Sequence, residues 1–526
     1  MFMPSTLDQP VLIDTPEFKS ILREISLPFK IEMNEGNNGF NVVQGSLGSQ
    51  SKKGVAEIDA FPIEKFGDAG FRKIYGVRCA FYAGAMANGI ASAEMVIALG
   101  KAGLMGSFGA AGMVRSKLET AVDQILSELP NGPYAFNLIH SPNEEALECN
   151  AVEVYLQKGV HVIEASAYLD LTPSLVYYRV AGLQKSLDNG VLITNRVIAK
   201  LSRSEVATKF MQPAPNVILE KLLSERKITL EQAALARLVP IADDITVEGD
   251  SGGHTDNRPL ICLLPTMLAL RDQIQEKYHY AIPVRIGVAG GISTPSSVLG
   301  AFMMGAAFVV TGSVNQACIE SGASPHTKKL LAEAGMADTA MAPSADMFEM
   351  GVKVQVLKKG TLFPMRAQKL YETYTHFDSI DQIPSEERAK LEKQIFQRDM
   401  QSIWQDTVKF FAERDPAQIE RAMNKPKRKM ALIFRWYLGL SSRWSIIGEP
   451  GREMDYQIWC GPSMGSFNDW TKLTYLSDPL KRRVVDVTLH LFTGAAYQYR
   501  IQLLKMHGFQ FLSNLEQYYP LSSLVE

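Results

Sequence analysis

The sequence predicts a (β/α)₈ barrel, in which eight parallel strands alternate with helices, followed by an α-helical C-terminal domain. Two observations predict the barrel. Short runs of β-branched and aromatic residues recur along the chain and end in small or polar residues, and stretches with helical periodicity separate most of them. The eight predicted strands are Val77–Ala83, Leu104–Phe108, Tyr134–Ile139, Val160–Ala165, Arg196–Leu201, Asp244–Glu248, Val284–Ala289 and Ala307–Thr311. An open, doubly wound sheet is the alternative arrangement of such units.

Helical periodicity is clearest in four of the intervening stretches, which we expect to cover the barrel. They are Ala91–Lys101, Ser116–Leu129, Glu144–Lys158 and Thr294–Met304. The uncharged stretch Ile286–Ile319 is long enough to cross a membrane, but small and polar residues interrupt it repeatedly. We therefore interpret it as strand, turn, helix and strand inside the barrel.

The composition is that of a water-soluble globular protein. Hydrophobic residues make up 46% of the 526 residues, charged residues make up 21%, and the formal net charge is −2. This balance favours neither nucleic acid nor an anionic membrane as a partner. The five cysteines form no CxxC pair, and the N-terminus has no apolar core of a secretory signal. We expect a cytoplasmic protein without a metal site.

We divide the chain into an N-terminal segment (1–75), a barrel (76–375) and an α-helical domain (376–526). Within the barrel, residues 204–242 hold more than one helix where a short connection is usual. An insertion after the carboxyl end of a strand lies at the active-site face. Two interpretations stay open for it, a lid over the substrate and a peripheral decoration.

Glycine-containing turns follow the last two strands. Val288-Ala-Gly-Gly-Ile-Ser293 contains Gly290 and Gly291, and Val310-Thr-Gly-Ser-Val314 contains Thr311, Gly312 and Ser313. Phosphate sites in barrels often use these two loops, because glycine permits close backbone approach and a helix N-terminus carries partial positive charge. Together they predict a phosphorylated ligand.

The first strand also ends in small residues, at Ala83, Gly84, Ala85 and Met86. A planar ring could lie against such backbone, although a tight strand-to-helix turn would explain the same residues.

Three of the middle strands end in polar side chains. Lys200 ends the fifth, where its ammonium could stabilise negative charge on a ligand or simply extend into solvent. Asn137 and Glu164 end the third and fourth, where each could bind a ring or orient a neighbour.

The sixth strand leads into Val247-Glu-Gly-Asp-Ser-Gly-Gly-His-Thr-Asp-Asn-Arg-Pro259. His254 is one of only eight histidines, and it follows two glycines at a strand end. Gly252 and Gly253 would let the backbone pass close to a ligand, and an imidazole can transfer a proton near neutral pH. No P-loop, HExxH or GxGxxG motif is present, so no separate dinucleotide-binding domain is expected.

These motifs resemble a known family. Gly252-Gly253-His254, Gly290-Gly291 and Met304-Gly-Ala-Ala-Phe-Val-Val-Thr-Gly-Ser313 resemble the nitronate monooxygenase (2-nitropropane dioxygenase) family of FMN barrels, which includes flavin-type enoyl reductases. Longer segments resemble its PfaD subgroup, the trans-acting enoyl reductases of polyunsaturated fatty acid and polyketide synthases. They are Tyr82–Ser92, Asn131–Pro142, Asp250–Pro259, Ala345-Asp-Met-Phe-Glu-Met-Gly351 and Lys427–Trp444.

The resemblance implies an FMN- and NADPH-dependent reduction of the α,β-double bond of thioesters on acyl carrier proteins. His254 would polarise the thioester or donate the α-proton, although solvent or another acid could donate it instead. The residues implied to hold the cofactor are Ala83, Gly84, Ala85, Met86, Asn137, Glu164, Lys200, Asp250, Gly253, Gly290, Gly291, Thr311, Gly312 and Ser313.

Partners and alternatives stay open. The basic, aromatic stretch Lys425–Trp444 could dock an acidic carrier protein, or its aromatics could simply pack on the barrel. A homodimer is one expected assembly. The alternative functions are nitronate oxidation with O₂, for which the insertion and the helical tail are unnecessary, and a non-catalytic docking role in a synthase.

Overall fold

The computed structural model describes residues 11–12, 16–33, 40–45, 54–140, 145–187, 190–511 and 513–525. Its centre is a closed barrel of parallel strands in the order β11-β12-β14-β15-β5-β6-β7-β8. The strands are β5 (Phe81–Ala83), β6 (Met105–Phe108), β7 (Ala135–Ile139), β8 (Val162–Ser166), β11 (Arg196–Leu201), β12 (Asp244–Glu248), β14 (Arg285–Ala289) and β15 (Val309–Thr311). All eight predicted strands are confirmed within a few residues, and the open-sheet alternative is wrong.

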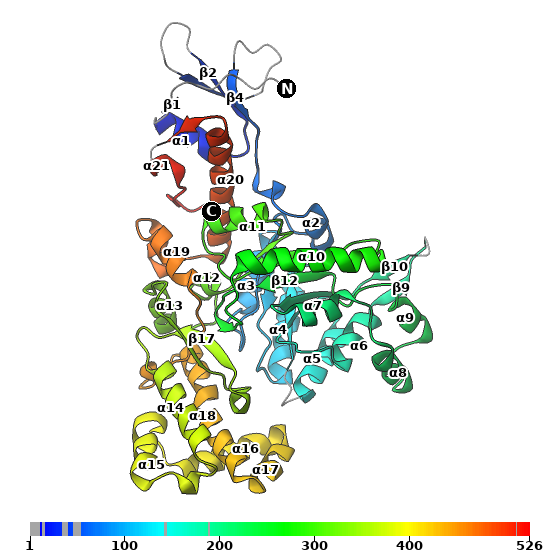
Figure 1. Cartoon of the computed structure of the whole chain (residues 1–526), viewed down its shortest axis with the longest axis vertical. Helices are drawn as coiled ribbons and strands as arrows, with labels where there is room; N and C mark the ends of the chain where they lie inside the picture. The colour runs from blue at the N-terminus through cyan, green and yellow to red at the C-terminus, as the bar shows by residue number, and fades with distance from the viewer. Residues whose placement is uncertain are drawn as a thin grey trace.

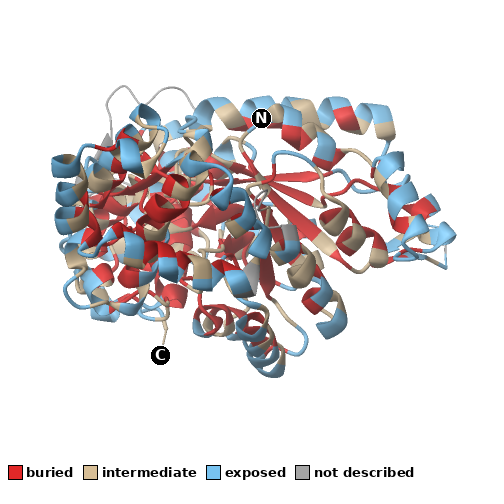
Figure 2. Ribbon diagram, turned by 90° about the horizontal axis from the view of Figure 1, so that it is seen from below, coloured by how far each residue is buried: buried red, intermediate tan, exposed pale blue. Residues whose placement is uncertain are grey.

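Seven helices of the barrel wall lie between consecutive strands. They are α3 (Ala93–Lys101), α4 (Arg115–Glu128), α5 (Glu145–Lys158), α6 (Pro173–Ala181), α7 (Ser204–Met211), α10 (Leu260–Tyr278) and α11 (Pro295–Met303). The four predicted helices are among them. Side-chain caps fix where two of these begin: the Ser92 hydroxyl accepts from the Met95 amide, and Thr294 forms a capping box with Ser297. Figure 2 shows the strands buried and the outer faces of these helices exposed.

The eighth helix of the wall comes from the far end of the chain. After β15 only the short α12 (Ser313–Gln316) follows, and the gap between α11 and α3 is filled by α20 (Val484–Met506). Phe492 of α20 lies 6.0 Å, ring to ring, from both Phe81 and Phe302. Figure 1 shows α20 beside α11. Residues 484–506, predicted to belong to the C-terminal helical domain, are therefore part of the barrel wall.

The N-terminal segment is anchored on the same helix. It comprises β1 (Val11–Leu12), α1 (Pro16–Arg23), α2 (Ala69–Tyr75) and the antiparallel sheet of β2 (Phe29–Met33), β3 (Phe40–Gln44) and β4 (Gly54–Ile58). The buried Arg500 guanidinium of α20 donates to the carbonyls of Leu22, Glu24 and Leu27 at 2.8 to 3.3 Å. β1 pairs with β18 (Phe509–Gln510), just after α20 and before α21 (Ser513–Glu516).

The insertion of residues 204–242 forms α7, α8 (Asn216–Ser224) and α9 (Leu230–Leu235). α7 packs on α10, whereas α8 and α9 pack on α6 and on β9 (Leu183–Lys185), which forms a hairpin with β10 (Val191–Ile193). Gln232 of α9 donates to the Ala181 carbonyl at 3.1 Å, on the connection that leads to the amino end of β11. These contacts favour the peripheral interpretation over a lid.

A second, smaller sheet lies outside the barrel. It is antiparallel and joins β13 (Gly253–His254) to β17 (Lys353–Leu357) and β17 to β16 (Thr339–Pro343). Its first strand is the Gly-His motif that follows β12, so this sheet fixes the position of His254. Neither β16 nor β17 was predicted.

The helical part that follows is a bundle around α18 (Pro426–Ile447), as the lower half of Figure 1 shows. Its other members include α14 (Phe363–His376), α15 (Ser385–Leu391), the π-helical turn Glu392–Phe396, α16 (Met400–Arg414) and α17 (Pro416–Met423), while α13 (Pro325–Ala332) and α19 (Ser463–Thr471) link it to the barrel. The basic stretch of α18 is engaged inside this part of the protein: Lys427 pairs with Asp378 at 3.0 Å, and Arg428 and Arg435 pair with Glu349. The aromatics pack in the bundle, not on the barrel: the Phe434 ring lies 5.9 Å from Phe396, and the Tyr437 ring lies 6.2 Å from Phe363.

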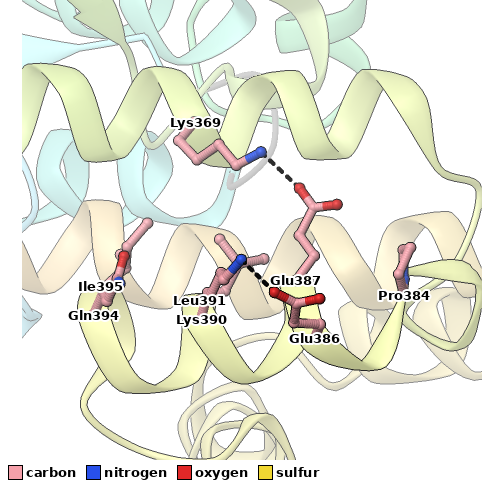
Figure 3. Close-up of a pocket in the computed structure, with 8 residues that line it drawn as sticks. All are labelled: Lys369, Pro384, Glu386, Glu387, Lys390, Leu391, Gln394 and Ile395. Atoms are coloured by element: carbon pink, nitrogen blue, oxygen red, sulfur yellow. Dashed lines mark hydrogen bonds and ion pairs between the residues drawn. The ribbon is translucent and has the colours of Figure 1, made fainter.

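Two features of the described residues bear on partners. No helix among them is both long and apolar enough to cross a membrane. A pocket between α14 and α15 is lined by charged side chains that already pair with one another, Lys369 with Glu387 at 2.6 Å and Lys390 with Glu386 at 2.7 Å (Figure 3). Its charges are thus satisfied within the bundle.

Candidate active site

A cleft opens at the carboxyl ends of the barrel strands, where barrels carry their active sites. It collects most of the predicted cofactor residues, from four different strand ends. Those that line it are Gly84, Ala85, Met86, Lys200, Gly290, Gly291, Thr311, Gly312 and Ser313. Ala83, Asn137, Glu164, Asp250, Gly253 and His254 are not among its lining residues.

Two glycines present bare backbone to this cleft. A β-carbon at Gly291 or at Gly312 would meet no atom within 4 Å, so both positions face open space. Gly291 has a φ of +76°, which favours glycine, whereas Gly312 has a φ of −131°. Gly312 therefore does not require a left-handed backbone, and its missing side chain leaves room for a ligand.

Two further cleft glycines are small for reasons of packing. A β-carbon at Gly290 would lie 2.8 Å from the Asp250 carbonyl oxygen, and one at Gly84 would lie 3.1 Å from the Val310 side chain. They allow the loops after neighbouring strands to lie close together. This arrangement presents Gly291 to the cleft.

The two hydroxyls of the last loop have protein partners. Thr311 is 2% exposed, and its Oγ1 exchanges hydrogen bonds with the Asn315 side chain at 2.9 to 3.1 Å. The Ser313 Oγ accepts from the Gly461 amide at 3.1 Å and keeps its own proton to donate. Of the two, Ser313 is the better placed to bond a ligand.

A cation and a carboxylate share the opposite side of the cleft. The Lys200 Nζ lies 3.0 Å from Glu248 Oε1, which also accepts from the Ser251 hydroxyl at 3.0 Å. Burial lowers the pKa of Lys200, but the charges of Glu248 and Glu164 outweigh it, so its pKa is raised above the ordinary value. The site therefore keeps an ammonium at neutral pH.

Asn137 and Glu164 orient neighbours instead of lining the cleft. Glu164 is fully buried, and its Oε2 accepts from the Ala85 amide at 2.8 Å, which fixes the loop after β5. Burial raises the pKa of this carboxyl, against the opposing charge of Lys200. The Asn137 Nδ2 donates to the Glu164 carbonyl at 3.1 Å and to Ser166 Oγ at 3.0 Å.

The Asp250 carboxylate organises the segment after β12. Its Oδ1 accepts from the side-chain amides of Asn257 and Gln355, both at 2.8 Å, and so ties the segment to β17. Its predicted contact with the cofactor has no support in this geometry.

Gly252 is small because another part of the chain crosses it. A β-carbon there would lie 2.8 Å from the Cys460 amide nitrogen, and a β-carbon on Gly461 would lie 2.8 Å from the Gly252 nitrogen. A β-carbon at Gly253 (φ +82°) would lie 3.9 Å from the Trp459 ring. Gly252 also lines the cleft, so the expectation that its backbone passes close to a ligand stays a prediction beside this chain-on-chain packing.

His254 is partly buried and has an acidic partner. Its Nε2 lies 3.2 Å from Asp346 Oδ1, and its side chain is 35% exposed. Burial disfavours the charged imidazole, but the hydrogen bond to Asp346 and the charge of that carboxylate outweigh it, so the pKa of His254 is raised. The pKa of Asp346 is lowered, because its contact with His254 outweighs its own burial.

Sequence reasoning missed several residues of this region. Gln316, Trp459 and Ser463 line the cleft, and Asp346 contacts His254. Trp459 belongs to a strand-like segment beside β17, where the Leu357 amide donates to the Ile458 carbonyl at 2.8 Å. The run Trp459-Cys-Gly-Pro-Ser463 with its glycine and proline, and the Ala345–Gly351 motif, were the available indications of both contributions.

Comparison with known proteins identifies the family. A family model described as nitronate monooxygenase matches residues 73–409. The chain belongs to the nitronate monooxygenase family. A second model, described as the inserted helical domain of [acyl-carrier-protein] S-malonyltransferase, matches residues 377–456, which include α15 to α18.

Relatives within this family share most of the chain. The enoyl reductase domain of MlnA, from the macrolactin biosynthesis cluster of Bacillus amyloliquefaciens, is 39% identical with a TM-score of 0.80, covering 85% of this chain and 100% of that one. One of the polyunsaturated fatty acid synthase subunits of Thraustochytrium sp. is 50% identical over 84% of this chain and 30% of its own length. Polyketide biosynthesis protein PksE of Bacillus subtilis is 45% identical over 82% of this chain and 56% of its own length.

The chain thus spans at most about half the length of these curated relatives. It is of the PfaD type within this family of oxidoreductases, and the family implies a flavin cofactor.

Proposed function

We propose that this protein is an FMN-dependent, NADPH-consuming enoyl reductase that acts in trans on α,β-unsaturated thioesters carried by acyl carrier proteins. One observation carries the proposal: the chain is 39% identical to an enoyl reductase domain over the whole of that domain. Relatives named as components of polyunsaturated fatty acid and polyketide biosynthesis support a synthase as the partner.

The cleft fits a flavin mononucleotide. Open space at Gly291 and Gly312, with the Ser313 hydroxyl beside them, would hold the phosphate, because bare backbone and hydroxyl donors suit an anion. Gly84, Ala85 and Met86 would lie against the ring. The chemistry that a bound FMN supplies is hydride transfer, accepted from NADPH and given to the β-carbon of the substrate.

The side chains supply electrostatics and a proton. The Lys200 ammonium, kept charged by Glu248, favours negative charge in the cleft. His254 would polarise the thioester carbonyl or donate the proton that the α-carbon takes up. Trp459, on the facing wall, would exclude water from the acyl chain.

The decisive experiment supplies NADPH and a crotonyl thioester to the purified, yellow protein. NADPH loss with formation of the saturated thioester supports the proposal, whereas turnover of a nitronate with O₂ and none of the thioester would refute it. A protein without flavin or turnover would indicate a docking role. His254→Ala should slow thioester reduction by about 10²-fold or more while FMN stays bound, and the exposed His376→Ala is the matched control.

A further inference from the structure

We propose that Asp346 is the positioning residue for His254, and that it leaves the Nδ1 atom of the imidazole as the one that transfers a proton to the substrate. This inference rests on the proposed function of His254. The evidence for it lies in the small sheet outside the barrel, formed by β13, β17 and β16.

The sheet brings two distant segments together. His254 in β13 is paired with Val354 in β17, and Asp346 lies in the connection between β16 and β17, where the Ser344 amide donates to the Val352 carbonyl at 2.9 Å. This hydrogen bond joins the two ends of the connection beside the strand that holds His254. Asp346 Oδ1 reaches Nε2 at 3.2 Å.

This contact selects one ring nitrogen. A carboxylate accepts hydrogen bonds, so Nε2 carries a proton toward Asp346, as in other carboxylate–histidine pairs. Nδ1 has no hydrogen-bond partner among the residues that the structure describes. It is therefore the nitrogen left for the substrate.

The surrounding charges act in known directions. Asp346 and Glu248 of β12 favour the imidazolium, and Lys200 of β11 opposes it. Because the pKa of His254 is raised, the ring keeps its second proton to a higher pH than an isolated histidine does. Removing the charge of Asp346 should therefore move the loss of that proton to lower pH.

The test measures the titration of His254 by NMR of histidine-labelled full-length protein, with His254→Gln to assign its signal. Asp346→Asn should lower the pKa of His254 by about one unit or more, and Asp346→Glu should restore most of it. The control is Glu349→Gln, which removes a carboxylate from the same connection, where it pairs with Arg428 and Arg435. An unchanged pKa in Asp346→Asn, or an equal fall in Glu349→Gln, would overturn the proposal.

A kinetic experiment tests whether the contact between Asp346 and His254 affects the reaction. In Asp346→Asn the alkaline limb of kcat/KM for the enoyl thioester should move to lower pH, while the rate of flavin reduction by NADPH stays within about twofold. Movement of both rates together would contradict a role through His254. A native protein that reduces no thioester would refute the proposed function but leave the NMR titration able to decide on the pair.

Discussion

On one side of the cleft, the barrel supplies backbone at Gly84, Gly291 and Gly312; on the other, Trp459 and Ser463 arrive from a segment that follows the helical bundle. The first wall consists of strand ends, each of which is visible in the local sequence pattern. The second depends on chain crossings, at Gly252 with Cys460 and Gly461 and at Ser313 with Gly461. One wall of a ligand site can thus follow from local sequence patterns, while the other depends on contacts between distant parts of the chain.

The largest expected effect concerns the barrel wall itself. Ending the chain before Val484 removes α20, whose inner face is buried against α11 and α3, and should abolish soluble folded protein. The milder Phe492→Ala should lower the free energy of unfolding by about 3–5 kcal/mol. The truncated chain is checked by soluble expression and circular dichroism, and Phe492→Ala by denaturant unfolding. Ending the chain after Pro520, where the next residues are mostly exposed, is the control. A folded barrel without α20 would show that the two regions are independent.

The next effect tests the crossing of the two walls. Gly252→Ala places a β-carbon 2.8 Å from the Cys460 backbone, which cannot give way as a flexible side chain would. We expect a loss of stability of about 1–3 kcal/mol and displacement of Trp459 from the cleft. Thermal unfolding and the KM for the thioester report these changes. A variant with native stability and native KM would mean that the crossing is dispensable.

Gly312→Ala is the matched change on the barrel wall. Its φ is negative and its β-carbon meets no atom within 4 Å, so the melting temperature of the protein without flavin should change far less than in Gly252→Ala. The added methyl group enters the space assigned to the cofactor, and FMN affinity should fall about tenfold, or about 1.4 kcal/mol. Flavin fluorescence titration measures this. Unchanged affinity would place the cofactor elsewhere.

A last effect, outside the cleft, is a pH dependence of α20. Burial lowers the pKa of His490 to about 4, against the opposing charge of Asp486, while Tyr475 and Tyr518 bond its two nitrogens at 2.8 Å. Because the folded pKa lies below the unfolded value near 6.5, this contribution is present above pH 6.5 and is lost as the pH falls toward 4. It amounts to about 3 kcal/mol.

His490→Gln should flatten that acid-induced decrease when unfolding is followed at pH 7, 5.5 and 4.5, and the exposed His376→Gln should not. An equally steep decrease in His490→Gln would assign the acid sensitivity to other groups.

Much of the barrel could be predicted from the sequence, because its strands are buried runs bounded by small or polar residues. The loops after the last two strands were predicted to meet at one site, and Gly291 and Gly312 do so. Asp346 and Trp459 could not be placed, because the motifs around them are visible in the sequence but do not show which site each residue reaches. At Gly252 the sequence could not reveal the packing against Cys460, because close approach of chain to chain and of chain to ligand select the same residue.

The position of α20 also bears on how the protein is made. The ribosome completes all eight strands by Thr311, yet the helix that seals the wall begins only at Val484, after the whole helical bundle. Until then the flank of β5 and α11 around Phe81 and Phe302 lacks its cover, and the nascent barrel exposes apolar surface. A piece cut at the family match of residues 73–409 would keep that open flank permanently, so domain borders drawn in larger synthases should include the returning helix.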